Sequence, residues 1–195
     1  MVRAAGIRRG DLVLDVGAGT GALTTHLVAA GARVVAVELH PVRARGLRDR
    51  FGDSIVVVRA DAADLRLPRR PFRVVANPPF GVTTALLRRL LGPGSRLVTA
   101  DLVVPASAAA RWAAGRGPGA GRWSASYGVR VVRRLPAGAF RPPAPLATAV
   151  LRIERHATGA ADPNAPPIFV KLSRPGGPRR TCPRCDSARP PPSPW

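Results

Sequence analysis

Short apolar runs alternate with helix-like stretches through the first half of the chain. Four runs rich in β-branched or apolar residues predict strands: Leu12–Val16, Arg33–Val37, Ile55–Val58 and Phe72–Ala76. Helices are predicted over Ala22–Ala30, Pro41–Phe51 and Thr83–Leu91. Alternating β and α units fold into a parallel sheet with helices on its faces. This order of elements therefore predicts a doubly wound α/β domain.

The second half continues the sheet and then changes character. Leu97–Val104 is a further apolar run, Ala106–Ala114 predicts a helix, and Gly115–Gly121 predicts a glycine-rich loop. Val129–Leu135 and Thr148–Ile153 predict the last two strands. The whole pattern therefore predicts a doubly wound sheet of seven strands.

Composition divides the chain near His156. Residues 1–156 carry the α/β pattern and are expected to form one domain. Ala157–Trp195 is rich in proline and arginine and has little periodicity, so we expect a disordered tail in which only Ile168–Leu172 could form a short strand. Cys182 and Cys185 have metal-ligand spacing, but a closed zinc site needs four ligands and no second pair follows, so we expect no metal.

The charge balance narrows the class of partner. The 195 residues include 31 Lys+Arg against 11 Asp+Glu, which gives a net charge of +20. Every basic side chain except Lys171 is arginine, which binds phosphate through a rigid fork. We therefore expect a polyanionic partner, and nucleic acid is the first candidate. No apolar run approaches the ~20 residues that span a bilayer, and we expect a cytoplasmic protein without a membrane partner.

A glycine-rich turn follows the first predicted strand. Asp15, Gly17, Gly19 and Gly21 stand between that strand and a helix, where glycines allow a tight turn and a close approach of backbone to ligand. With Ala22 the segment also fits a relaxed dinucleotide fingerprint. The acid before the glycines favours S-adenosylmethionine, because a carboxylate suits the ammonium group of that ligand better than a pyrophosphate.

Acidic residues end the next two strands. Glu38 follows the second strand and could accept hydrogen bonds from both hydroxyls of a ribose. Asp61-Ala62 follows the third strand and could accept from the exocyclic amine of the adenine of a cofactor. Asp61 could instead cap a turn, and Asp64 remains an alternative acceptor.

The most specific motif is Asn77-Pro78-Pro79-Phe80, directly after the fourth strand. The exocyclic amine of adenine is a poor nucleophile because its lone pair is delocalised into the ring. The Asn77 side-chain oxygen and the Pro78 carbonyl could accept its N–H groups and favour a pyramidal nitrogen. Phe80 offers a face on which a flipped-out base can stack. Asn77, Pro78 and Phe80 are therefore the candidate catalytic residues.

Together with the proline-rich stretch Phe140–Val150, these motifs resemble the rRNA adenine N6-methyltransferases. That family includes the dimethyltransferases of small-subunit rRNA and the macrolide-resistance dimethyltransferases of large-subunit (23S) rRNA. The segments Arg122-Trp123 and Val131–Pro136 resemble the resistance branch. The match extends over about Val2–Arg155, and by this resemblance the chain would lack the usual helical C-terminal domain.

With this resemblance, we expect a Rossmann-like class I methyltransferase with a seven-stranded, mostly parallel sheet and an antiparallel last pair. It would use S-adenosylmethionine to methylate N6 of an unpaired adenine in large-subunit rRNA, and we expect a monomer. Such an enzyme would confer macrolide-type resistance. The implied cofactor residues are Asp15, Gly17, Gly19, Gly21, Glu38, Asp61, Ala62 and Asn77. A small-subunit rRNA, DNA adenine or protein glutamine methyltransferase remains an alternative, as does a nucleic-acid-binding relative without turnover. The Phe140–Val150 stretch argues against DNA and protein substrates.

Overall fold

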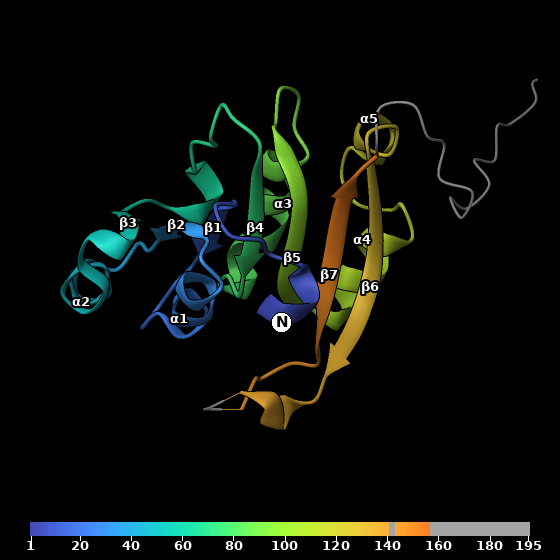
Figure 1. Ribbon diagram of the computed structural model, residues 1–195. Coiled ribbons are helices and arrows are strands. Elements are labelled where there is room, and N and C mark those ends of the chain that lie inside the picture. The colour runs from blue at the N-terminus through green and yellow to red at the C-terminus, as the bar shows by residue number, and fades with distance from the viewer. Residues whose placement is uncertain (141–142, 157–195) are drawn as a thin grey trace, which may run out of the picture. The chain divides into compact units, whose positions relative to one another are not determined.

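A computed structural model describes residues 1–140 and 143–156 (Figure 1). Seven strands form one sheet in the order β3-β2-β1-β4-β5-β7-β6. Their bounds are β1 Leu12–Val16, β2 Arg33–Val37, β3 Ile55–Val58, β4 Phe72–Ala76, β5 Leu97–Pro105, β6 Tyr127–Leu135 and β7 Thr148–Arg155. The strands β1 to β5 pair in parallel, and β7 pairs antiparallel with both β5 and β6. The predicted fold is confirmed.

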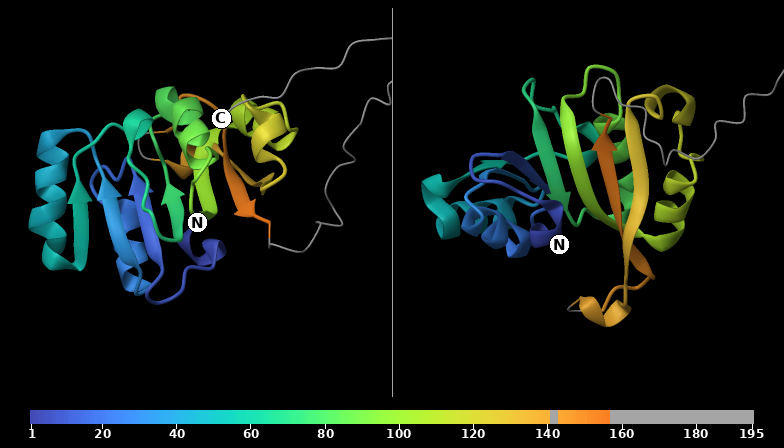
Figure 2. Two further views of the ribbon diagram at one scale, coloured as in Figure 1. Left: turned by 90° about the horizontal axis from the view of Figure 1, so that it is seen from above. Right: turned by 45° about the vertical axis from the view of Figure 1, so that its right-hand side comes forward.

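Helices cover both faces of the sheet. The α-helices are α1 Ala22–Ala29, α2 Pro41–Phe51, α3 Thr83–Leu90, α4 Ala106–Ala113 and α5 Ala120–Trp123. Short 3₁₀ turns are η1 Val2–Ala5, η2 Gly52–Ser54, η3 Ala62–Asp64, η4 Phe80–Val82 and η5 Ala137–Ala139. Seen from above, α1 lies on one face and α3 on the other (Figure 2).

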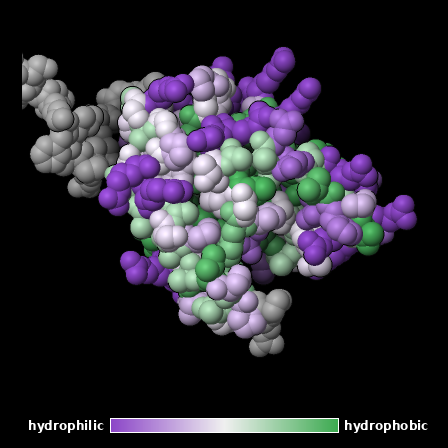
Figure 3. All heavy atoms as spheres, turned by 180° about the vertical axis from the view of Figure 1, so that it is seen from behind, coloured by the Kyte–Doolittle hydropathy of each residue, from purple (hydrophilic) through white to green (hydrophobic). Residues whose placement is uncertain are grey.

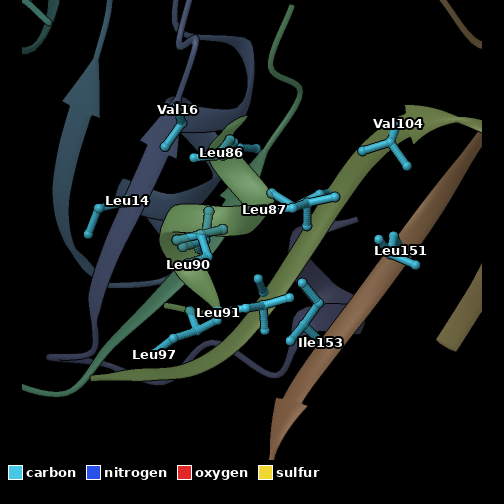
Figure 4. Close-up of a cluster of buried hydrophobic side chains, with 14 of the residues drawn as sticks. Leu14, Val16, Leu86, Leu87, Leu90, Leu91, Leu97, Val104, Leu151 and Ile153 are labelled. Carbon is cyan, nitrogen blue, oxygen red and sulfur yellow. The ribbon is translucent and has the colours of Figure 1, made fainter. Parts of the chain in front are cut away.

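Two apolar clusters hold these layers together, one on each face. On the face of α3, the helix buries Leu86, Leu87 and Leu90 against strands β1, β5 and β7 (Figure 4). On the other face, Leu27 of α1 and Leu47 of α2 pack with residues of η1, β1 and β2. The leucines of α3 recur at three- and four-residue spacing, which places them on one side of the helix.

The element bounds agree with those predicted to within two residues at each end. The difference lies in the predicted loop Gly115–Gly121, where α5 begins at Ala120. Its Trp123 is buried and stacks on Trp112 of α4, with ring centroids 5.6 Å apart. A contact between aromatic side chains eleven positions apart overrides the low helix propensity of glycine.

Two aspartates are buried in the sheet with opposite surroundings. Asp101 of β5 binds the guanidinium of Arg152 through both carboxylate oxygens, at 2.7 and 2.9 Å. That guanidinium also donates to the carbonyl oxygen of Ala4, which ties η1 to the sheet. Asp15 of β1 is buried without a cationic partner among the described ion pairs.

Within residues 1–140 and 143–156, no helix has the length and apolar character needed to cross a membrane. The predicted disordered tail, its short strand and the pair Cys182 and Cys185 lie outside the described residues.

Candidate active site

A cavity of about 440 Å³ opens at the carboxyl edge of the parallel strands. Segments far apart in the sequence lie together there, because the turns that follow parallel strands all lie at the same edge of the sheet. Eight of the predicted site residues line it, all in segments that follow strands β1 to β4: Gly17, Gly19, Glu38, Asp61, Ala62, Asn77, Pro78 and Phe80. The predicted convergence of strand-end residues is therefore seen in the structure.

The glycine turn forms one wall of the cavity. The N–H groups of Gly17 and Ala18 donate to the carbonyl oxygen of Val37, at 2.8 and 3.1 Å, which fixes the turn on β2. Gly17 has φ +74°, and a Cβ there would lie 3.0 Å from Pro79 Cδ and 3.2 Å from Pro78 Cα. A side chain at position 17 would therefore push against the Asn77–Phe80 turn.

Glu38 is buried, yet it lines the cavity. Its Oε2 accepts a hydrogen bond from the Gly19 N–H at 2.8 Å, and its Oε1 accepts from the His40 N–H at 2.9 Å. Each carboxylate oxygen keeps a second lone pair. Glu38 can thus hold the glycine turn and still accept hydroxyl groups from a ligand.

Asp15 does not line the cavity, although we predicted a direct role in ligand binding. Its Oδ2 accepts from the Thr24 hydroxyl at 2.7 Å, while its buried Oδ1 has no hydrogen-bond partner among the described residues. Burial raises the pKa of Asp15 to about 6, and the negative charge of Glu38 adds to the shift. Asp15 lies within β1, behind the glycine turn, so its role as a cofactor residue stays a prediction.

Gly21 is also absent from the cavity wall. It precedes α1 with φ +88°, and a Cβ there would lie 2.6 Å from the ring of Phe51. The third glycine therefore serves the packing of α1 against α2 in this structure.

The structure separates the two candidate acids after β3. Asp61 and Ala62 line the cavity, and Asp61 Oδ1 accepts from the Ala63 N–H at 2.8 Å to cap η3. Asp64 does not line it and forms an ion pair with Arg89. Asp61 thus caps a turn and is also accessible to a ligand in the cavity, so the two roles named for it in the sequence are compatible.

The Asn77–Phe80 turn forms the opposite wall. Pro78 is buried, Asn77 is exposed, and Phe80 is partly buried. The Val82 N–H donates to the Pro79 carbonyl at 3.1 Å, which leads the chain into η4 and α3. No hydrogen bond to the Asn77 side chain occurs among the described residues, so its carboxamide is available to a ligand.

Sequence reasoning missed part of the cavity wall. Phe140 and the neighbouring positions Pro143, Ala144 and Pro145 line it, as do Leu39 and Arg43. The first set lies in the connection between β6 and β7, at the lower end of those strands in Figure 1. Since β6 runs in the same direction as β5, the loop after it reaches the carboxyl edge too. This placement follows from the predicted topology, whereas nothing in the spacing indicates Arg43.

The residues of the cavity fit S-adenosylmethionine. Glu38 and Asp61 are acceptors suited to ribose hydroxyls and to an amine, and the glycine turn lacks side chains where a ligand backbone would approach. The apolar residues of the lining suit an adenine ring. No group of three or more potential metal-binding side chains occurs in the part of the chain that the structure describes.

Comparison with known families decides the class. The family model described as "Ribosomal RNA adenine dimethylase" matches residues 1–169. The chain belongs to this family. It is 37% identical to "Ribosomal RNA small subunit methyltransferase A" of Leifsonia xyli subsp. xyli over 175 residues, covering 83% of this chain and 62% of that protein. It is also 37% identical to the mycinamicin-resistance protein MyrB of Micromonospora griseorubida, covering 83% of this chain and 52% of MyrB.

Solved structures share the fold of this chain. The 23S rRNA methyltransferase ErmE superposes with a TM-score of 0.70 at 27% identity, covering 80% of this chain and 65% of that one. A dimethyladenosine transferase from Plasmodium falciparum gives a TM-score of 0.69 at 21% identity and covers 80% of this chain and 59% of that one. The chain thus spans roughly half to two thirds of these family members, and the relatives split between small- and large-subunit names.

Proposed function

We propose that this chain methylates N6 of a specific adenine in 23S rRNA, with S-adenosylmethionine as methyl donor, and that the modification confers macrolide-type resistance. The observation that carries the proposal is the single cavity that joins the glycine turn and Glu38 to the Asn77–Phe80 turn. One side of that cavity has acceptors for a cofactor, and the other has an amide, a carbonyl and an aromatic ring for a base.

The part of the cavity that would bind the cofactor has hydrogen-bond acceptors and a glycine backbone without side chains. Glu38 would bind the ribose hydroxyls, Asp61 the adenine amine, and Gly17 and Gly19 would lie against the ligand. Bound S-adenosylmethionine supplies a methyl group on a sulfonium, an electrophile that requires no metal.

The chain's own residues prepare the acceptor amine. The Asn77 side-chain oxygen and the Pro78 carbonyl oxygen accept the two N–H groups of the adenine amine. These contacts favour a pyramidal nitrogen whose lone pair is no longer delocalised into the ring. Proline at 78 and 79 fixes the turn and removes two N–H donors that would compete for the same acceptors.

Two aromatic rings line the base side of the cavity. Phe80 comes from the turn after β4, and Phe140 comes from the connection between β6 and β7. A flipped-out adenine could stack on such rings, which offsets part of the cost of leaving its own stack. That cost is lowest for an unpaired base, so an adenine in a loop is the expected target.

The choice of the large subunit rests on three similarities. ErmE is a 23S rRNA methyltransferase, MyrB is a resistance protein, and the segments Arg122-Trp123 and Val131–Pro136 resemble the resistance branch. Methylation of small-subunit rRNA is the second candidate, favoured by the 37% identity to small-subunit methyltransferases. The proposed partner is therefore rRNA, with the large subunit preferred.

The deciding experiment compares substrates side by side. The purified full chain is incubated with radiolabelled S-adenosylmethionine and naked 23S rRNA, 16S rRNA or duplex DNA, and the modified nucleotide is mapped by mass spectrometry. We expect methyladenine at one position of 23S rRNA. Faster labelling of 16S rRNA would support the second candidate, and faster labelling of duplex DNA would refute both.

A further inference from the structure

A second hollow surface lies at the other end of α3. Two adjoining hollows, of about 440 and 310 Å³, share Arg88, Gly92 and Pro93. They lie beside the segments that lead into β4 and β5, the loops at the top of Figure 1. We call the surface formed by Arg69, Arg88, Arg89, Gly92, Pro93 and Arg122 the arginine groove.

The arginine groove is strongly positive. Among the residues that the structure describes, no Asp or Glu lines either hollow. Arg89 is held by Asp64, whereas Arg69, Arg88 and Arg122 are exposed and take part in no ion pair among the described residues. From behind, hydrophilic side chains project along the top of the molecule (Figure 3). The groove therefore presents three free guanidinium groups to one ligand.

Helix α3 connects the groove to the cavity of the proposed active site. Its first residue follows η4, whose Phe80 and Val82 line the cavity, and its last turn carries Arg88 and Arg89. Eight residues at about 1.5 Å each make the helix ~12 Å long. At a rise of ~3.4 Å per stacked nucleotide, this distance corresponds to roughly four nucleotides.

We propose that the arginine groove binds phosphates of the RNA strand that flanks the target adenine, about four nucleotides from it. This inference rests on the proposed function, because it takes the cavity to hold the target base. One guanidinium group can donate two parallel hydrogen bonds to the oxygens of a phosphate. Such contacts fix the position of the RNA strand on the protein without reading its base sequence. RNA is favoured over an acidic peptide because one strand can occupy groove and cavity together at this spacing.

The test removes the three free charges and leaves the paired Arg89 in place. The variant Arg69→Gln/Arg88→Gln/Arg122→Gln is compared with Arg33→Gln/Arg45→Gln/Arg48→Gln, which removes three exposed arginines elsewhere. Affinity is measured without cofactor for a 30-nucleotide single-stranded RNA with one central adenine, over a range of salt concentrations. Circular dichroism and thermal melting check that both variants are folded.

We expect the groove variant to bind this RNA at least tenfold more weakly at low salt. Its log–log salt slope should be shallower by about 2, at ~0.7 for each lost phosphate contact. The control variant should lose clearly less affinity. A trinucleotide with a central adenine is too short to reach the groove and should bind both variants and the unchanged chain alike.

Two results would overturn the inference. One is equal loss of affinity in the groove and control variants, which would indicate a general charge effect. The other is poly-glutamate binding that is as tight as RNA binding and is lost in the groove variant, which would assign the groove to an acidic protein segment. Failure of methyl transfer alone would count against the proposed function and not against the groove, because binding is measured without cofactor.

Discussion

The two ends of the parallel strands carry opposite kinds of side chain. At the carboxyl edge, Glu38, Asp61, Asn77 and apolar residues line the cavity, and Arg43 is the one cation among its described lining residues. At the amino edge, no acidic side chain of the described residues lines the arginine groove. Helix α3 runs between the two. The separation implies that changes at the carboxyl edge should alter methyl transfer while leaving RNA affinity nearly unchanged.

The largest expected effect comes from Asn77→Ala. This change removes one aimed acceptor from the cavity, and the loss of one such group costs roughly 10²–10³-fold in rate. Asn77 is exposed, and its side chain makes no hydrogen bond among the described residues, so stability should be unchanged. Single-turnover methyl transfer to rRNA is the measurement.

A matched control is Asn77→Asp, which keeps the shape and an acceptor oxygen. It should retain more activity than Asn77→Ala while binding RNA alike. Near-normal turnover in Asn77→Ala would remove this residue from the mechanism.

The second prediction separates two glycines of the same turn. Gly17 and Gly19 both have positive φ, so alanine at either costs about 1–2 kcal/mol in backbone strain. Only Gly17 touches the Asn77–Phe80 turn, because the nearest atom to a Cβ at Gly19 is 3.9 Å away. Gly17→Ala should displace that turn. Since small misplacements of reacting groups reduce rates strongly, we expect at least ~10-fold lower methyl transfer than in Gly19→Ala.

Urea unfolding of both variants supplies the control. Similar losses of stability with unequal activity would support the view that Gly17 positions the Asn77–Phe80 turn for methyl transfer. Equal activity in the two variants would show that the close approach of Gly17 to Pro78 and Pro79 is not needed for methyl transfer.

Much of this site could be predicted from the sequence, because it depends on local order. A strand followed by a polar residue or a glycine turn fixes which residues reach the carboxyl edge, and Gly17, Glu38, Asp61 and Asn77 all lie there. The strands themselves were predictable since parallel strands, buried on both faces, are nearly continuous apolar runs.

The remainder depends on contacts that sequence spacing does not encode. Asp15 occupies the position before the glycines but lies inside β1, where its side chain meets Thr24 and not the cavity. The arginine groove combines Arg69, Arg88 and Arg122, which come from three separate segments. Their proximity depends on the packing of α3 and α5, and the first two residues of α5 fall in the predicted loop Gly115–Gly121.

The third prediction compares the two buried aspartates as a function of pH. Because the folded-state pKa of Asp15 is about 6, above the ordinary value of 3.8, the folded chain binds this proton more tightly than the unfolded chain. The stability that this provides is present below about pH 4 and is lost as pH rises to about 6. The loss at neutral pH is about 3 kcal/mol.

Asp15→Asn removes this loss and should raise the free energy of unfolding at pH 7.5 but not at pH 4. Asp101→Asn should have the opposite sign at pH 7.5, because it leaves Arg152 without its partner, at a cost of about 3–5 kcal/mol. Urea unfolding at both pH values is the measurement. A stabilised Asp15→Asn chain with weaker S-adenosylmethionine binding would support the predicted role of Asp15, and full binding would refute it.

The last prediction concerns Glu38→Gln, and its reason is hydrogen-bond geometry. Both carboxylate oxygens accept from backbone N–H groups, so an amide in either orientation sets its own N–H₂ against the N–H of Gly19 or His40. Leaving one such donor unsatisfied costs about 1–3 kcal/mol, and the glycine turn should loosen. We expect roughly 10–100-fold weaker S-adenosylmethionine binding by calorimetry.

Asp61→Asn is the matched control. Because Asp61 is exposed and accepts a hydrogen bond from one backbone N–H group, its effect should be smaller. RNA affinity should be unchanged in both variants, and a loss of RNA binding in Glu38→Gln would show that the two edges are not independent.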